Sequence, residues 1–198
     1  MVKAANELVI NEKALSYAVT GISDPGTMVI PYATTLYRLA STYTKEADQR
    51  PVPERYPTLQ AYEVADKKWM FDNSSEEVWA RLIKGSWWFT SADLMRFKYA
   101  SMEDGVPLSN CGRQALAVAS FWNNAEFMVE AKVKPTGGLK VFYGKGCTQT
   151  VEDPADSNIH KLLADPNVIQ LYIPGLHVLE NARAWLTLVH RHRLRRSS

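Results

Sequence analysis

The chain has few of the residues and motifs that would assign it a function at once. It has two cysteines in 198 residues, Cys111 and Cys147, and neither lies at a metal-ligand spacing. One disulfide is possible, but two free thiols are the better interpretation. There is no glycine-rich phosphate loop of either standard spacing, and no serine or cysteine nucleophile signature accompanies the four histidines. The sequence therefore gives no support to metal catalysis, a disulfide scaffold or a glycine-loop nucleotide enzyme.

Long apolar runs are also absent. No run approaches the roughly 18 residues of a membrane span, and the N-terminus lacks the apolar centre of a secretory signal. We therefore expect a cytoplasmic protein, or a piece of an exported chain that is delivered into the cytoplasm of a target cell. No membrane partner is expected.

Positive and negative charges nearly balance in this sequence, except at the C-terminal end, which is basic. The net charge is +2, but the final stretch "VHRHRLRRSS" carries four arginines and two histidines. Such an end is either solvated or contacts a nucleic acid or an acidic partner.

The remaining composition is that of a globular protein, with 46% hydrophobic and 22% charged residues. We expect a single domain over residues 1–198. Within it, residues 1–30 are interpreted as an N-terminal extension, 31–176 as a catalytic-like core and 177–198 as a basic C-terminal segment.

Hydrophobic spacing predicts helices mainly in the first half and short strands mainly in the second, an α+β fold with largely antiparallel pairing. Strands are predicted at 34–40, 86–90 and 127–133, and in "GGLKVFYGKG" and "NVIQLYIPG". Helices are predicted at 58–71, after "DNSS", from Ser91 as N-cap, at 114–122 and in "DPADSNIHKLLADP". Residues 42–57 read as a mobile loop, and "ARAWLTLVHRHRL" fits a strand or a helix.

Two predicted strands carry a polar side chain among apolar neighbours. Arg38 lies within "TLYRLAS", and a buried arginine needs a partner. That partner is either a carboxylate across the sheet or a bound phosphate or carboxylate group. Gln170 lies within "VIQLYIPG", where the simplest interpretation is an edge residue facing water.

A third position combines aromatic and hydroxyl side chains in "KGSWWFTSADLMRF". Trp88 and Phe89 are either core residues or a platform for a flat ring. Thr90 and Ser91 are either helix caps or polar groups of a site.

Taken in order, these three positions resemble the ADP-ribosyltransferase toxin family of the arginine, serine, glutamate type. The resemblance extends from about Thr34 to Pro174 and includes the spacer "FMVEAKVKPTGGLKVFYGKG". It implies an ADP-ribosyltransferase-like split antiparallel β-sandwich with flanking helices, and NAD as substrate in a cleft between two sheets.

The resemblance also implies roles for single residues. Arg38 would contact a phosphate of NAD or position the strand around it. Thr90 and Ser91 would support the site and orient the catalytic side chain, although Phe89 stands where the family has its first serine. Trp88 and Phe89 would line the nicotinamide pocket.

Gln170 falls where the family has its catalytic glutamate. A glutamine offers no full negative charge to an oxocarbenium-like transition state, a loss that commonly costs a hundredfold or more in rate. The chain is thus an inactivated variant, a member that works with glutamine, or a relative that only binds.

The resulting expectation is a toxin or effector domain that cleaves the nicotinamide–ribose bond and transfers ADP-ribose to a macromolecular acceptor, a protein or a nucleic acid. An immunity protein or antitoxin is a possible partner. The alternatives are a NAD glycohydrolase toxin and a non-catalytic module that binds nucleic acid or protein through the basic end.

Overall fold

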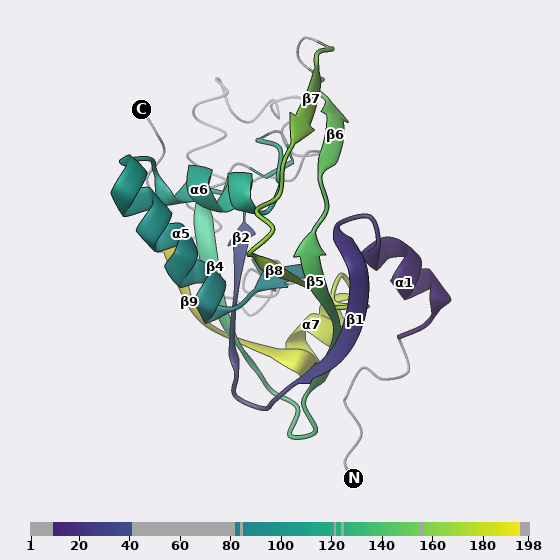
Figure 1. Ribbon diagram of the computed structural model, residues 1–198. Coiled ribbons are helices and arrows are strands. Elements are labelled where there is room, and N and C mark those ends of the chain that lie inside the picture. Colours follow the sequence, from purple (N-terminus) through teal and green to yellow (C-terminus); the bar gives the residue numbers. More distant parts are fainter. Residues whose placement is uncertain are drawn as a thin grey trace, which may run out of the picture.

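A computed structural model describes residues 10–40, 82–83, 85–120, 122–123, 125–154 and 157–194. Its seven-stranded sheet is formed by β1 (Ile22–Ile30), β2 (Thr35–Ala40), β3 (Trp87–Phe89), β4 (Phe127–Val133), β5 (Leu139–Gly146), β8 (Ile169–Tyr172) and β9 (Leu186–Arg193). The spatial order is β1-β5-β8-β3-β2-β4-β9, and each neighbouring pair is antiparallel (Figure 1). The predicted α+β class is confirmed.

Both edge strands come from the segments that the sequence set apart from the core. Strand β1 lies in residues 1–30, and β9 lies in residues 177–198. Most of the described basic end therefore pairs with β4 as part of the sheet.

The sheet is weakest at its middle. Strands β2 and β3 are joined by one residue pair, Tyr37 with Phe89, whereas β3 pairs with β8 over three positions. Beyond that pair, the end of β2 and the start of β3 are not paired with each other. The split that the resemblance implies is here a local separation of β2 from β3 within one hydrogen-bonded sheet.

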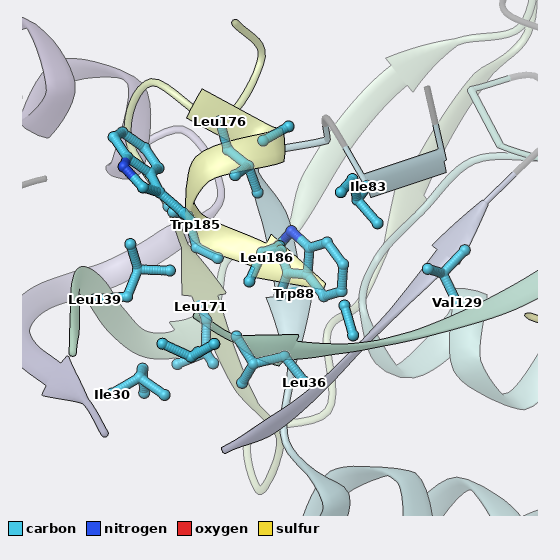
Figure 2. Packing of buried hydrophobic residues seen from close by; sticks show 14 of the residues in the cluster. Ile30, Leu36, Ile83, Trp88, Val129, Leu139, Leu171, Leu176, Trp185 and Leu186 are labelled. Atoms are coloured by element: carbon cyan, nitrogen blue, oxygen red, sulfur yellow. The ribbon is translucent and has the colours of Figure 1, made fainter. Parts of the chain in front are cut away.

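Helices cover both faces of the sheet. Helices α5 (Ser91–Asp104) and α6 (Leu108–Ala115) lie over one face (Figure 1), where their apolar side chains pack with Leu39, Phe89 and Met128. On the other face, α7 (Leu179–Trp185) contributes to the largest cluster, which includes Trp88, Leu36 and Leu171 (Figure 2). Helix α1 (Glu12–Ala18) packs on the outer strands with Ile22, Phe142 and Tyr172.

One predicted helix is misplaced. The sequence predicted a helix at 114–122, but α6 spans Leu108–Ala115. Gly105 ends α5 in the left-handed conformation, with φ 65°. Only three residues, Gly105, Val106 and Pro107, separate the helices, because Pro107 supplies the N-cap backbone of α6. Ala117 at φ 52° follows the end of α6, inside the predicted span.

A second predicted helix, in "DPADSNIHKLLADP", is wrong. This segment contains strand β7 (Ile159–Leu162), which pairs with β6 (Gln149–Glu152) in a separate two-stranded sheet. The turn between them is closed by main-chain bonds that join Asp153 to Ser157 and Asn158. Asp153 and Ser157 belong to this turn and not to a helix start.

Three further details differ from the predictions. The N-cap of α5 is Thr90 and not Ser91. The alternation of apolar and polar residues over 127–133 predicts a half-exposed strand, but β4 is buried on both faces at most positions, because α5 and α6 cover the side where Met128 lies. The ambiguous C-terminal segment holds both candidate structures, the end of α7 and then β9.

The predicted loop at 42–57, the helix at 58–71 and most of the helix after "DNSS" lie outside the described residues. Within the described ranges, no helix has the length and apolar character needed to cross a membrane. Cys111 and Cys147 are free thiols, as predicted, and burial raises the pKa of Cys111.

Candidate functional site

A cavity of about 350 Å³ lies where β2 and β3 separate. Its walls come from β2, β3, β8, the start of β6, the turn before β1 and the segment after α6. The lining residues are Thr20, Gly21, Arg38, Leu39, Gly85, Ser86, Trp87, Trp88, Phe89, Leu116, Ala117, Val118, Trp122, Asn123, Gln149 and Gln170. Four of the six predicted site residues are therefore brought together: Arg38, Trp88, Phe89 and Gln170. Thr90 and Ser91 are not in the lining.

Arg38 is the only charged residue among these lining residues. Its Nη1 donates a hydrogen bond of 3.0 Å to the carbonyl oxygen of Leu82, and its guanidinium carbon lies 5.8 Å from the centre of the Trp88 ring. Its Nε is buried without a hydrogen-bond partner. Burial lowers the pKa of Arg38 to about 10, so the side chain is still cationic at neutral pH. Of the two expected partners, a carboxylate across the sheet is not found among the described residues.

Gly85 makes room for this guanidinium. A Cβ at position 85 would overlap the terminal atoms of Arg38. The Gly85 carbonyl also accepts a hydrogen bond of 2.6 Å from Nε1 of Trp88. Position 85 thus fixes both the arginine and the tryptophan that faces it.

Trp88 and Phe89 are almost fully buried, each with 1% of its surface exposed. They belong to the apolar clusters on opposite faces of the sheet, because neighbouring residues of a strand point to opposite sides. Phe89 makes an edge contact with Phe97, with ring centres 5.2 Å apart. Both residues are mainly core, which limits the surface they offer to a ligand.

Two other tryptophans in the lining were not predicted. Trp87 is half-buried, packs against Tyr172 with ring centres 4.9 Å apart, and lies directly over Gly21. Trp122 lies in the segment between α6 and β4 and is 43% exposed. Because neighbouring side chains of a strand point to opposite faces, the sequence indicates that Trp87 and Trp88 lie on different sides of β3. No sequence pattern indicates that Trp122 lines the cavity.

Gln170 does not face water, contrary to the simplest prediction. It is 7% exposed because β8 is an interior strand between β5 and β3. Its Nε2 donates a hydrogen bond of 3.1 Å to the carbonyl oxygen of Leu116, and the carboxamide packs against Gly146. The amide group, and not a carboxylate, matches this acceptor.

Thr90 has a structural partner that was not predicted, Asp93. The Thr90 hydroxyl donates to the Asp93 carboxylate at 2.6 Å, and the two residues form the capping box of α5. The other oxygen of Asp93 accepts the backbone N–H of Ile169 at 3.2 Å. Thr90 therefore acts through Asp93 on the strand that carries Gln170. Ser91 is exposed at the first position of α5.

The remaining polar groups of the cavity are mainly carboxamides turned toward main-chain carbonyls. Nδ2 of Asn123 donates to Leu39 at 2.9 Å, and Nε2 of Gln149 donates to Thr20 at 2.7 Å. The described residues that line the cavity include no aspartate, glutamate, histidine or cysteine. Elsewhere in the described ranges, no group of three such side chains could hold a metal ion. The site is suited to binding an anionic ligand and has no described side chain suited to proton transfer.

No family model matches the sequence, and no curated protein matches it. A solved structure titled "Rhs1-CT in complex with cognate immunity protein RhsI1" is similar to the chain, with a TM-score of 0.47 and 10% sequence identity. The match covers 93% of this chain and 96% of that one.

Proposed function

We propose that the cavity between β2 and β3 binds NAD, and that the chain is an ADP-ribosyltransferase-like toxin or effector domain with glutamine at the catalytic position. The observation that carries the proposal is the shared cavity of Arg38 and Gln170, which lie far apart in the sequence. The two residues reach the cavity from opposite faces of the sheet, because Arg38 lies on the face of Trp88 whereas Gln170 is paired with Phe89. A ligand that contacts both therefore has to occupy the gap between β2 and β3.

The chemistry of the lining fits a dinucleotide. Arg38 is a desolvated cation without a carboxylate partner among the described residues, and a diphosphate can supply the missing charge. The tryptophans at positions 87 and 122 offer surface for a flat ring, and carboxamides suit ribose hydroxyls. The volume of about 350 Å³ lies within the range of small-molecule sites.

Gln170 sets the expected rate. Cleavage of the nicotinamide–ribose bond develops positive charge on the ribose, which a carboxylate stabilises and a carboxamide does not. The described lining holds no other acid that could substitute. We therefore propose tight binding of NAD with turnover on the order of a hundredfold or more below that of a glutamate enzyme.

Calorimetric titration of NAD into the full chain tests the binding step. We expect saturable heat with one site, and a loss of about tenfold or more in affinity for Arg38→Gln. Lys98→Gln, an exposed substitution on α5, serves as the control and should bind as the parent chain does. No heat at millimolar NAD, with the fold intact by circular dichroism, would exclude the proposal.

A NAD glycohydrolase uses the same site with water as acceptor, and release of free ADP-ribose without labelled protein or nucleic acid identifies it. A non-catalytic binding module is the second candidate, favoured by the lack of an acid in the described lining. It predicts nucleic-acid or protein binding that weakens steeply with salt and does not change in Arg38→Gln. For a toxin, the acceptor is a macromolecule of the target cell, and the producing cell needs an immunity protein or antitoxin.

A further inference from the structure

Arg113 on α6 repeats the arrangement of Arg38. Its Nη2 donates to the side-chain oxygen of Asn110 at 2.7 Å, and its Nε is buried without a hydrogen-bond partner. Burial lowers the pKa of Arg113, as it does for Arg38. Neither arginine forms an ion pair with a described carboxylate. Arg113 is less deeply buried than Arg38, but the buried part of its guanidinium has no anionic partner among the described residues, and an anionic ligand offsets the cost of that burial.

Arg113 lines a second cavity, of about 510 Å³, between α6 and the β6–β7 hairpin. The side chains that can donate hydrogen bonds to a ligand there are Asn110, Arg113, Gln114, Ser120, His160 and Lys161. One carboxylate, Asp153, also lines it. Arginine and lysine together outweigh that single negative charge, so the cavity favours an anion.

The two cavities have a common wall. Ala117 and Val118 line both of them. The neighbouring carbonyl of Leu116 accepts the hydrogen bond of Gln170, and Ala117 has a φ of 52° that turns the chain at this point. A group bound at Arg113 is therefore separated from the Gln170 site by one short segment of main chain.

We propose that the second cavity binds a phosphate group. Six donor side chains suit the several acceptor oxygens of a phosphate better than the two oxygens of a carboxylate. The phosphate has two possible sources: a dinucleotide whose diphosphate lies at Arg113 in place of Arg38, or a phosphate-bearing acceptor such as a nucleic-acid strand. The acceptor interpretation rests on the proposed function, whereas phosphate binding at Arg113 does not.

Inorganic phosphate and pyrophosphate, titrated into the full chain without NAD, test the site. We expect amide resonance shifts in the walls of the cavity, at residues 118–120 and 160–163, with an affinity that falls about tenfold or more in Arg113→Gln. Arg113→Lys keeps the charge and should lose less, and Lys161→Gln should weaken binding several-fold. Lys98→Gln on α5 is the matched control. No shifts at millimolar pyrophosphate and low salt, or shifts that persist unchanged in a folded Arg113→Gln, would overturn the proposal.

The same variants identify the source. A weaker NAD affinity in Arg113→Gln assigns the phosphate to the dinucleotide. Unchanged NAD affinity together with lost binding of a short single-stranded oligonucleotide assigns it to a nucleic-acid acceptor. If Arg113→Gln alters neither while it abolishes pyrophosphate binding, both sources are rejected and the cavity is a site for free phosphate. Failure of NAD to bind at Arg38, with phosphate still bound at Arg113, rejects the proposed function alone.

Discussion

The carboxylate of Asp93 accepts the backbone N–H of Ile169 at 3.2 Å and thereby ties the start of α5 to the start of β8. The same carboxylate closes the capping box with Thr90, and only 3% of the surface of Asp93 is exposed. Because Gln170 follows Ile169, one acidic side chain fixes both a helix start and the strand position of the candidate catalytic residue.

Replacing Asp93 by alanine should destabilise the protein by about 2–4 kcal/mol, because a helix cap is lost and a buried N–H loses its acceptor. Urea unfolding measures the change in free energy. Glu103→Ala, exposed on the same helix, is the control and should stay within about 0.5 kcal/mol. A loss of less than about 1 kcal/mol for Asp93→Ala would contradict the bridging role.

Gly85→Ala should displace the Arg38 guanidinium, because a Cβ at that position overlaps it. We expect NAD affinity to fall about tenfold or more, measured by calorimetry. Gly26→Ala is the matched control: there a Cβ meets the ring of Tyr143 at 2.9 Å, on the edge strand and outside the lining. It should reduce stability and leave NAD affinity unchanged. Equal losses of affinity in the two variants would mean that the effect is not local to Arg38.

Gln170→Glu should have two opposite effects. Nε2 of Gln170 donates to the Leu116 carbonyl, and a carboxylate would face that oxygen without a proton to share. We expect a stability loss of about 1–3 kcal/mol. We also expect NAD cleavage to appear or to rise about a hundredfold. Nicotinamide release, followed by chromatography, is the readout, with Lys98→Glu on the exposed side of α5 as control. Unaltered release in a folded Gln170→Glu that still binds NAD would reject Gln170 as the catalytic position.

The pH dependence of NAD binding should follow Arg38. Its pKa is about 10 in the free protein, and a bound diphosphate raises that pKa because it favours the charged form. Affinity is therefore constant from pH 6 to about 9 and falls as the pH rises through about 10. Calorimetry from pH 6 to 10.5, with circular dichroism to verify folding, measures the profile. A midpoint between about pH 6 and 7 would instead indicate a histidine.

The sequence predicted well where one strong local signal decided the structure. Threonines and aromatics with a proline upstream mark β2, and alternation between glycine-bearing turns marks β5, so both strands lie close to their predicted bounds. The convergence of Arg38 and Gln170 on one cavity was predicted from a resemblance, since residue spacing carries no information on which strands become neighbours.

The predictions failed where contacts between distant segments determine the local structure. The acidic and serine-bearing stretch before Ile159 was predicted to start a helix, but β7 forms because β6 supplies a partner strand. Ser91 and Thr90 are equally good caps by composition; the capping box with Asp93 selects Thr90. Trp122 reaches its cavity through the fold of the segment after α6, and Arg113 reaches its cavity from α6, whose bounds the sequence did not predict. No periodicity in the sequence indicates either contact.

The joining of β2 to β3 by a single residue pair has a mechanical consequence. A sheet with one weak seam can widen there while each of its other strand pairs stays intact. We therefore expect the gap beside Arg38 to vary in width, and amide exchange at Tyr37 and Phe89 should report how far it opens.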